Sequence, residues 1–130
     1  MTSNLNKEAA RTYFAEVLNR GDMDSADRIF APGLLFHYPL GQLSGADAVK
    51  TYLQTFRIAF PDAIFEVSSL IGEGRHVSAR WSLSGSQTGD FKGKPPTGKR
   101  VSLPGITWFE VDDGRIQEMW VAFDPMLLID

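Results

Sequence analysis

The spacing of apolar residues changes once along this chain, at Pro61, and that change limits the folds available to it. Before Pro61 the apolar side chains recur at helical spacing, whereas after it they alternate with polar ones, as in half-buried strands. When helices come first and a meander of strands follows, the helices cover one face of an antiparallel sheet. We therefore predict an α+β fold with three N-terminal helices packed on a curved antiparallel sheet.

The first two helices are predicted from their stripes and their ends. Residues 5 to about 19 combine an apolar stripe with good helix formers, and Gly21 follows that segment. Either Asp22 or Asp24 can cap a short second helix, which Pro32 stops. The apolar run LLFHY then predicts a first strand.

The third helix has the clearest signals. Ser44 and Asp47 resemble a capping box, and apolar residues repeat at helical spacing from Val49 to Phe60. Pro61 ends the segment. One face of this helix, including Phe56, should therefore pack on the sheet.

Four longer strands are predicted after Pro61, joined by short turns and one long loop. The segments GEG (72–74) and DDG (112–114) indicate hairpin turns. SQTGDFKGKPPTGKR, residues 86 to 100, is too rich in glycine and proline for a continuous strand, so we predict a loop near the pocket mouth, stiffened by Pro95 and Pro96. The strands are expected at about 63 to 71, 76 to 86, 100 to 111 and 115 to 124.

Composition narrows the class of protein. The 130 residues provide material for one domain, residues 1 to 130, with 16 acidic and 13 basic side chains. Basic residues gather only around Lys92, Lys94, Lys99 and Arg100, which argues against nucleic acid as a partner. There is no cysteine and no apolar run of the roughly 20 residues that would span a bilayer. We expect a cytoplasmic protein without disulfides and without membrane contact.

The last strand predicts a semi-polar pocket wall. If the strand is unbroken, Glu118, Trp120 and Asp124 share a face, where an indole lies in line with two carboxylates. Alternatively, Glu118 pairs with Arg80 and only Trp120 packs. A bulge would exchange the two faces beyond it. In either arrangement Asp124 has no obvious partner in the sequence.

Other candidate residues are few, and standard motifs are absent. His37, beside Tyr38, is either structural or catalytic, and His76 follows a turn and is expected at the surface. Trp81 and Trp108 fit a core as well as a site. Two histidines so far apart make a poor metal site, and no phosphate-binding loop, dinucleotide fingerprint or hydrolase motif occurs. A pocket without metal or cofactor is the simplest interpretation.

Several stretches together resemble the SnoaL-like polyketide cyclases, within the nuclear-transport-factor-like superfamily. They are FHYPLGQLSGADAV, AFPD at 59 to 62, VSARW at 77 to 81, FKGKPPTG at 91 to 98 and DGRIQEMWVAFD at 113 to 124. The resemblance implies a conical fold with a deep pocket, often a homodimer, and intramolecular aldol ring closure. It also implies that Asp124, the acid of the W-x-x-x-D pattern, is catalytic. Relatives carry histidine in a GTHxG stretch where this chain has GSQTG, so Gln87 takes that place.

Three functions are consistent with these residues. The first is cofactor-free enolate chemistry on a small hydrophobic carbonyl compound, with Asp124 as the base in an aromatic pocket that raises its pKa, and His37 as second candidate. The second is isomerisation, hydration or hydrolysis in the same pocket. The third is a non-catalytic protein that binds an apolar ligand. The residues predicted to bind substrate are Tyr38, Phe56, Arg80, Trp81, Gln87, Trp108 and Trp120.

An open sheet face of this size must be covered, so we expect a homodimer formed through the convex surface. The apolar residues predicted for that surface are Val77, Ala79, Val121 and Phe123.

Overall fold

The structure, a computed structural model, describes residues 2–90, 93 and 95–129. Within these residues no helix is both long enough and apolar enough to cross a membrane. The elements in chain order are α1 (Thr2–Thr12), the π-helix η1 (Tyr13–Leu18), α2 (Met23–Ile29), β1 (Phe30–Tyr38), β2 (Gly41–Ser44), α3 (Ala46–Ala59), β3 (Ile64–Glu73), β4 (His76–Ser86), β5 (Arg100–Asp112), β6 (Arg115–Ala122) and α4 (Met126–Ile129).

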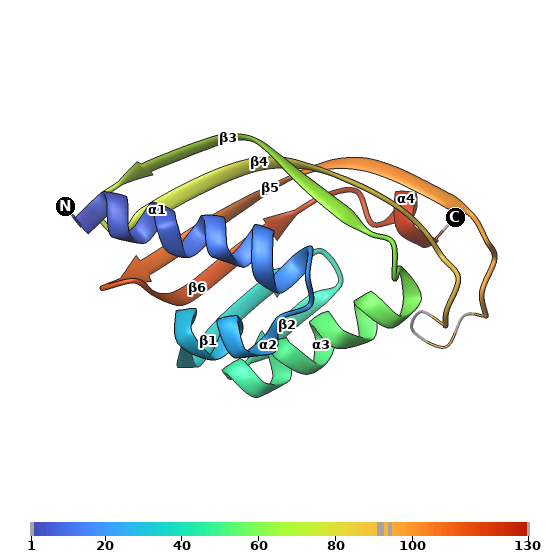
Figure 1. The fold of residues 1–130 in the computed structure, drawn as a ribbon, viewed down its shortest axis with the longest axis horizontal. Helices are drawn as coiled ribbons and strands as arrows, with labels where there is room; N and C mark the ends of the chain where they lie inside the picture. The colour runs from blue at the N-terminus through green and yellow to red at the C-terminus, as the bar shows by residue number, and fades with distance from the viewer. Residues whose placement is uncertain (1, 91–92, 94, 130) are drawn as a thin grey trace.

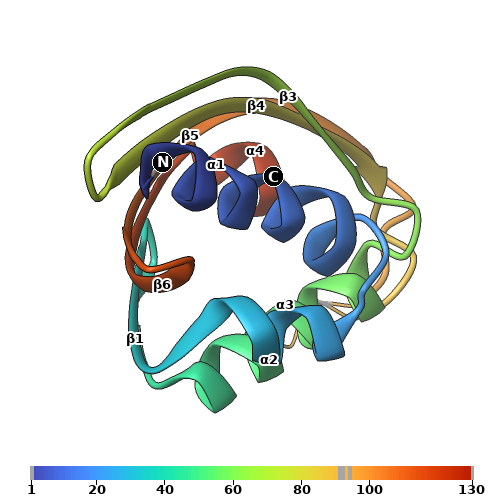
Figure 2. The same ribbon diagram turned by 60° about the vertical axis from the view of Figure 1, so that its left-hand side comes forward.

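The six strands form one curved sheet in the order β2-β1-β6-β5-β4-β3. Neighbouring strands are antiparallel except β1 and β6, which are parallel. Figures 1 and 2 show β3, β4 and β5 arching over α1, with α2 and α3 on the same concave side. The predicted α+β fold, with helices on one face of a curved sheet, is confirmed. The sheet is not closed, because β2 and β3 remain as its edges.

Helix ends follow the predicted chemistry in one case and depart from it in another. Asp22 caps α2, and its side chain accepts hydrogen bonds from the backbone N–H groups of Asp24 and Ser25. The capping box predicted at α3 does not form. Gly45 is the N-cap of α3, with φ of 97° and no side-chain hydrogen bond. Backbone freedom at this glycine therefore replaces the cap expected from Ser44.

Some strand boundaries differ from the predicted ones. β1 begins at Phe30 and pairs with β6 through an irregular register between Phe30 and Leu35, which accommodates Pro32 in a strand. The short strand β2 and the C-terminal helix α4 were not predicted. The hairpin between β5 and β6 is confirmed: Asp113 and Gly114 have φ of 53° and 78°, as a two-residue type I′ turn requires.

Glu118 and Trp120 share a face of β6, as predicted, but the prediction that this face forms the pocket wall is wrong. β5 and β6 pair out of step between Glu110 and Val111, so Ile116 and Met119 both point into the core. Beyond the bulge, Trp120 lies on the convex side and is 40% exposed. The structure therefore contains the bulge considered as an alternative, which places Ile116 and Trp120 on opposite faces of the sheet.

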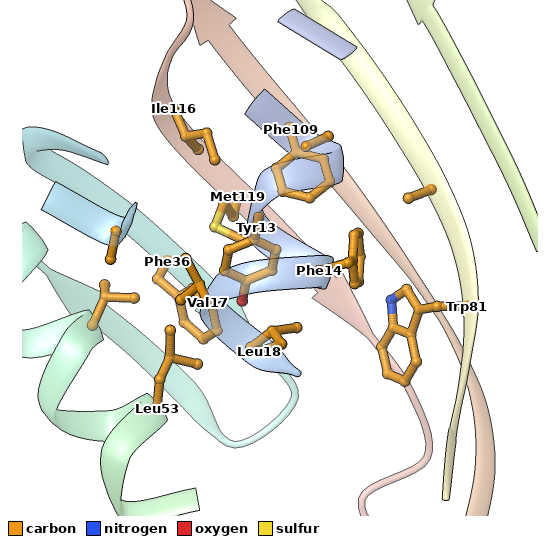
Figure 3. Packing of buried hydrophobic residues seen from close by; sticks show 14 of the residues in the cluster. Tyr13, Phe14, Val17, Leu18, Phe36, Leu53, Trp81, Phe109, Ile116 and Met119 are labelled. Atoms are coloured by element: carbon orange, nitrogen blue, oxygen red, sulfur yellow. The ribbon is translucent and has the colours of Figure 1, made fainter. Parts of the chain in front are cut away.

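The core lies between α1, η1, α3 and the concave face of the sheet. Figure 3 shows Tyr13 and Phe14 below Phe109 of β5, with Trp81 of β4 on the far side of Phe14 from Tyr13. Tyr13 and Phe109 meet edge to face, with ring centroids 5.6 Å apart. The surface predicted for a convex dimer interface is wrong. Two of its residues, Val77 and Ala79, belong to this core and are 1% and 0% exposed. The other two, Val121 and Phe123, pack against the core.

Candidate functional site

A cavity of about 60 Å³ lies between the helices and the concave face of the sheet. One ordered water needs roughly 10–15 Å³ on the same scale, so the cavity holds a few waters or a small group. Carboxylates and imidazoles are absent from the fifteen residues that line it. These residues are Tyr13, Phe14, Leu18, Phe36, Tyr38, Tyr52, Leu53, Phe56, Phe65, Trp81, Leu83, Leu103, Thr107, Val121 and Phe123.

A second and more open hollow lies against the first. It has a volume of about 490 Å³ and is lined by residues of α1, η1 and β3, together with Asn19. Phe14 and Phe65 line both spaces and therefore form the wall between them. Their ring centroids are 6.4 Å apart. A ligand larger than the first cavity could be admitted if these two side chains moved.

The π-helix η1 presents the helical wall of the cavity. Its wider turn brings residues five apart onto one side, so Tyr13 and Leu18 both line the cavity together with Phe14. In Figure 3 the Tyr13 hydroxyl points away from Phe109 and toward Phe36. The segment thus contributes one hydroxyl group and two apolar side chains to the wall.

Three tyrosines place phenol groups along the cavity wall. Tyr38 and Tyr52 pack with ring centroids 4.9 Å apart. Burial, with a smaller effect from Tyr52, raises the pKa of Tyr13 well above its usual range. Burial, with a smaller effect from Tyr38, raises the pKa of Tyr52 in the same way. The phenols of Tyr13 and Tyr52 therefore stay neutral at any working pH and can donate hydrogen bonds.

Thr107 adds a hydroxyl group to the cavity wall, and a hydrogen bond from Trp81 fixes its orientation. Thr107 is 2% exposed, and its Oγ1 accepts a hydrogen bond of 2.9 Å from Nε1 of Trp81. Because that oxygen already accepts, its own proton can be donated to another group. The indole of Trp81 needs Gly105 on the adjacent strand, since a Cβ there would lie 2.2 Å from a ring carbon. The position of the Thr107 hydroxyl therefore depends on Trp81, and the position of Trp81 depends on the missing side chain at Gly105.

Asp124 does not face the cavity, which corrects the predicted position. It is exposed, and its Oδ1 accepts a hydrogen bond of 3.0 Å from the backbone N–H of Met126. Its carbonyl oxygen accepts from the N–H of Leu127 at 3.2 Å. Asp124 thus begins α4, as an acid before proline often does. The preceding residue, Phe123, does line the cavity.

His37 lies on the convex face of the sheet, away from the cavity. Its Nε2 donates to Oε2 of Glu118 at 2.6 Å, and its ring stacks on Trp120 with centroids 5.4 Å apart. The predicted pair between Glu118 and Arg80 does not form. Arg80 instead bonds Ser68, with Nε 3.3 Å from that hydroxyl oxygen.

His76 and Trp108 form a second pair on the same convex face. Nε1 of Trp108 donates to Nδ1 of His76 at 3.3 Å, and Trp108 is 45% exposed. The two histidines of the chain therefore lie outside the cavity. In the part of the chain that the structure describes, no group of three or more His, Asp or Glu side chains is placed to hold a metal.

Gln87 organises the long loop between β4 and β5. Its Nε2 donates to the carbonyl oxygens of Gly89 and Pro95, both at 3.3 Å, and its Oε1 accepts from Thr97 at 3.2 Å. It is 6% exposed and does not line the cavity. Of the residues predicted as loop, Ser86 ends β4 and Arg100 begins β5, and the described residues between them have no strand, as predicted. The backbone N–H groups of Thr88 and Gly89 donate to the carbonyl oxygen of Ala59, the last residue of α3. The remaining loop residues, Phe91, Lys92 and Lys94, lie outside the described residues.

The structure brings Tyr38, Phe56 and Trp81 together in the cavity wall and leaves the other predicted contacts elsewhere. Arg80, Trp108 and Trp120 lie on the convex face. Sequence reasoning missed Tyr13, Tyr52 and Thr107. The two tyrosines sit in apolar helix stripes, where aromatic residues usually indicate core. Thr107 alternates with buried residues along β5, and that alternation was the available signal.

Comparison with known proteins agrees with this architecture. The family model of SnoaL-like polyketide cyclases matches residues 8–129. A proposed SnoaL-like polyketide cyclase from Jannaschia sp. CCS1 is 25% identical, with a TM-score of 0.92 over 98% of this chain and 91% of that one. AclR, a proposed hydroxylase from Streptomyces galilaeus, is 28% identical, with a TM-score of 0.78 over 95% and 78%.

A proposed polyketide cyclase from Acidithiobacillus ferrooxidans is 27% identical, with a TM-score of 0.80 over 96% of this chain and 92% of that one. A search of curated protein sequences finds no significant match. The family model covers nearly the whole chain, and the solved structures share its sheet and helices. The chain therefore belongs to the SnoaL-like polyketide cyclase family.

Proposed function

We propose that this protein is a cofactor-free acid/base enzyme that closes a ring in a polyketide-like carbonyl compound by intramolecular aldol reaction. The observation that carries the proposal is the cavity, whose walls are aromatic and whose side-chain polar groups are three phenols, one alcohol and one indole. Such walls suit a hydrophobic carbonyl compound, whose oxygen can accept hydrogen bonds from the hydroxyls. A compound of that size requires Phe14 and Phe65 to move, so that the cavity of about 60 Å³ joins the adjacent hollow. Membership of the cyclase family supports the same reaction class.

The hydroxyls would stabilise the charge that develops during the reaction. Removal of a proton next to a carbonyl gives an enolate, whose carbon attacks a second carbonyl of the same molecule and forms the new carbon–carbon bond. The resulting alkoxide takes the proton back, so atoms and charge balance. Tyr52 and Thr107 are the donors we assign to the enolate oxygen, because burial keeps Tyr52 neutral and Trp81 leaves the proton of Thr107 free to donate.

We assign proton transfer to Asp124, the carboxylate that follows Phe123 of the cavity wall. In the structure Asp124 instead accepts a hydrogen bond from the N–H of Met126. The assignment therefore requires that Asp124 release α4 and turn inward when substrate binds. Catalytic contacts often tighten only in the substrate complex, so the open arrangement is compatible with this role.

Deuterium exchange tests the assignment without knowledge of the natural substrate. 2-Tetralone is a flat aromatic ketone, and loss of its C1 proton signal in D₂O reports enolate formation by NMR. Asp124→Asn keeps an oxygen that can cap α4 and removes the base, so exchange should fall by roughly 10² or more. Asp124→Ala removes both features and serves as the matched control for loss of the cap.

The outcomes separate the candidate functions. Normal exchange in Asp124→Asn would show that Asp124 only caps α4. Binding of 2-tetralone without any exchange in the wild type would indicate a non-catalytic binding protein. Isomerisation shares the exchange step but forms no carbon–carbon bond, so ring closure is tested separately with 2,6-heptanedione, for which cyclisation yields the six-membered hydroxyketone.

A further inference from the structure

Asn19, the C-cap residue of η1, bonds both sides of the wall that separates the cavity from the adjacent hollow. Its side-chain Nδ2 donates to the carbonyl oxygen of Phe65 at 2.9 Å, and its Oδ1 accepts from the Phe65 N–H at 2.7 Å. Its backbone N–H donates to the carbonyl oxygen of Phe14 at 3.0 Å. Asn19 thus bonds the backbones of Phe14 and Phe65, whose rings form the wall.

The bonds between Asn19 and Phe65 resemble those of a neighbouring strand. β3 is an edge of the sheet, and the outward backbone groups of an edge strand have no strand to pair with. At Phe65 the Asn19 amide bonds both the N–H and the carbonyl in place of that strand. Arg57 of α3 fixes Asn19 in turn, because its Nη1 donates to the carbonyl oxygens of Leu18 and Asn19 at 2.8 and 3.2 Å. The end of η1 is therefore bonded to both β3 and α3.

The ring of Phe65 packs against other aromatic rings of the cavity wall. Its centroid is 6.4 Å from that of Phe14, 6.0 Å from that of Phe56 and 5.2 Å from that of Trp81. The ring cannot turn aside without moving these neighbours, because packed aromatic side chains leave little free space. The wall therefore opens when β3 moves away from η1, and the two hydrogen bonds between Asn19 and Phe65 resist that movement.

We propose that Asn19 is a positioning residue that limits the size of the ligand, because its amide keeps β3 against η1. This role rests on the proposed use of the cavity as the ligand site, but it does not require the reaction. A fused-ring ketone such as 2-tetralone binds when the wall opens, so its apparent affinity is reduced by the small fraction of molecules in which the wall is open. Acetone, on the scale of a few waters, needs no opening.

Removal of the Asn19 amide tests the proposal. Asn19→Ala keeps the backbone bonds of residue 19 and loses both bonds to Phe65, so the open state becomes more populated. Protein-detected NMR titration should show 2-tetralone binding about tenfold more tightly than to the wild type, with acetone affinity within about twofold. Asn19→Asp keeps the acceptor for the Phe65 N–H and loses the donor to its carbonyl. It should give a smaller gain, and it provides the test if the alanine variant does not fold.

The matched control is Asn6→Ala in α1. The Asn6 Nδ2 donates to the carbonyl oxygens of Gly74 and Val111 at 3.0 and 3.2 Å, and its Oδ1 accepts from the Gly114 N–H at 3.2 Å. Asn6 thus also joins a helix to backbone groups of the sheet, but it lines neither the cavity nor the hollow. Its replacement should lower stability and leave the affinity for 2-tetralone within about twofold of wild type.

The affinities separate the outcomes. Equal or weaker 2-tetralone binding in the Asn19 variants, or no binding in any of the proteins, overturns the proposal. An equal gain for acetone, or an equal gain in Asn6→Ala, also overturns it, because general loosening would then explain the effect. Tighter binding to the Asn19 variants without deuterium exchange in any protein would refute the proposed reaction alone. Exchange in the wild type with equal affinities in all variants would refute the role of Asn19 alone.

Discussion

Thr107 and Phe109 of β5 are buried, whereas Trp108 between them is 45% exposed. The same alternation separates two surfaces with different chemistry. The concave face holds aromatic rings and neutral hydroxyls, and the convex face holds the two histidines, two of the three tryptophans and the neighbouring carboxylates of Glu110 and Glu118. The two histidines and Trp120, which look catalytic in the sequence, therefore lie on the convex face. The cavity on the concave side is built from residues that look structural.

The largest expected difference between the faces is in stability. The Phe109 side chain is fully buried against Tyr13 and Phe14, so Phe109→Ala should lower the free energy of unfolding by about 3–5 kcal/mol. Trp108→Ala should change it by less than about 1 kcal/mol. Urea unfolding of both variants at the same submicromolar concentration, where association contributes little, gives the comparison. Equal losses would mean that the faces are assigned wrongly.

A smaller effect is expected at Thr107. Thr107→Val leaves the buried N–H of Trp81 without an acceptor, which should cost about 1–3 kcal/mol of folding free energy. It should also slow 2-tetralone exchange about tenfold, because the proposed donor is lost. Thr107→Ser keeps the hydroxyl and should restore both properties. If serine fails to restore exchange while folding recovers, the methyl group and not the hydroxyl is what the site needs.

Alkaline pH should weaken the fold through the buried phenols. Burial raises the pKa of Tyr13 and Tyr52 in the folded protein, so stability is complete below pH 10, the usual pKa of tyrosine, and falls as pH rises above it. The slope should reach roughly 1.4 kcal/mol per pH unit for each tyrosine. Tyr13→Phe should remove one of the two contributions to this loss of unfolding free energy per pH unit. Denaturant unfolding between pH 9 and 11 measures it, and an unchanged slope would contradict the burial argument.

The smallest effect is expected from the convex histidines. His37→Gln keeps a hydrogen-bond donor for Glu118 and should leave 2-tetralone exchange within about twofold of wild type. His76→Gln should behave in the same way. NMR exchange rates measured beside the wild type test this, and a tenfold loss in either variant would place catalysis on the convex face.

The sequence predicts the fold well because its main signals are local. The change of period at Pro61, the cap at Asp22 and the turn at Asp113 and Gly114 each reflect backbone preferences of a few residues. The parallel pairing of β1 with β6 could not be predicted in the same way. It joins segments at opposite ends of the chain, and nothing in either strand alone specifies the partner.

The site was harder to predict because it depends on which face of each strand turns inward. Alternation gives two faces without saying which is buried, and the bulge at Gln117 of β6 then exchanges them after Ile116. The prediction that Trp120 forms the pocket wall failed for this reason. Asp124 was placed by continuing the strand, but β6 ends at Ala122 and the acid caps α4 instead. Trp81, for which the sequence allowed either a core or a site position, lies in the cavity wall and in the core.

The central claim is that neutral hydroxyls inside the cavity stabilise an enolate. The most direct test removes the two phenol hydroxyls that burial keeps neutral, that of the assigned donor Tyr52 and that of Tyr13, while keeping their rings. The variant is Tyr13→Phe/Tyr52→Phe, and 2-tetralone exchange is the readout. The account predicts a fall of roughly 10² in the exchange rate, with near-unchanged circular dichroism and retained ligand binding. A folded double variant that exchanges 2-tetralone at the wild-type rate would contradict it.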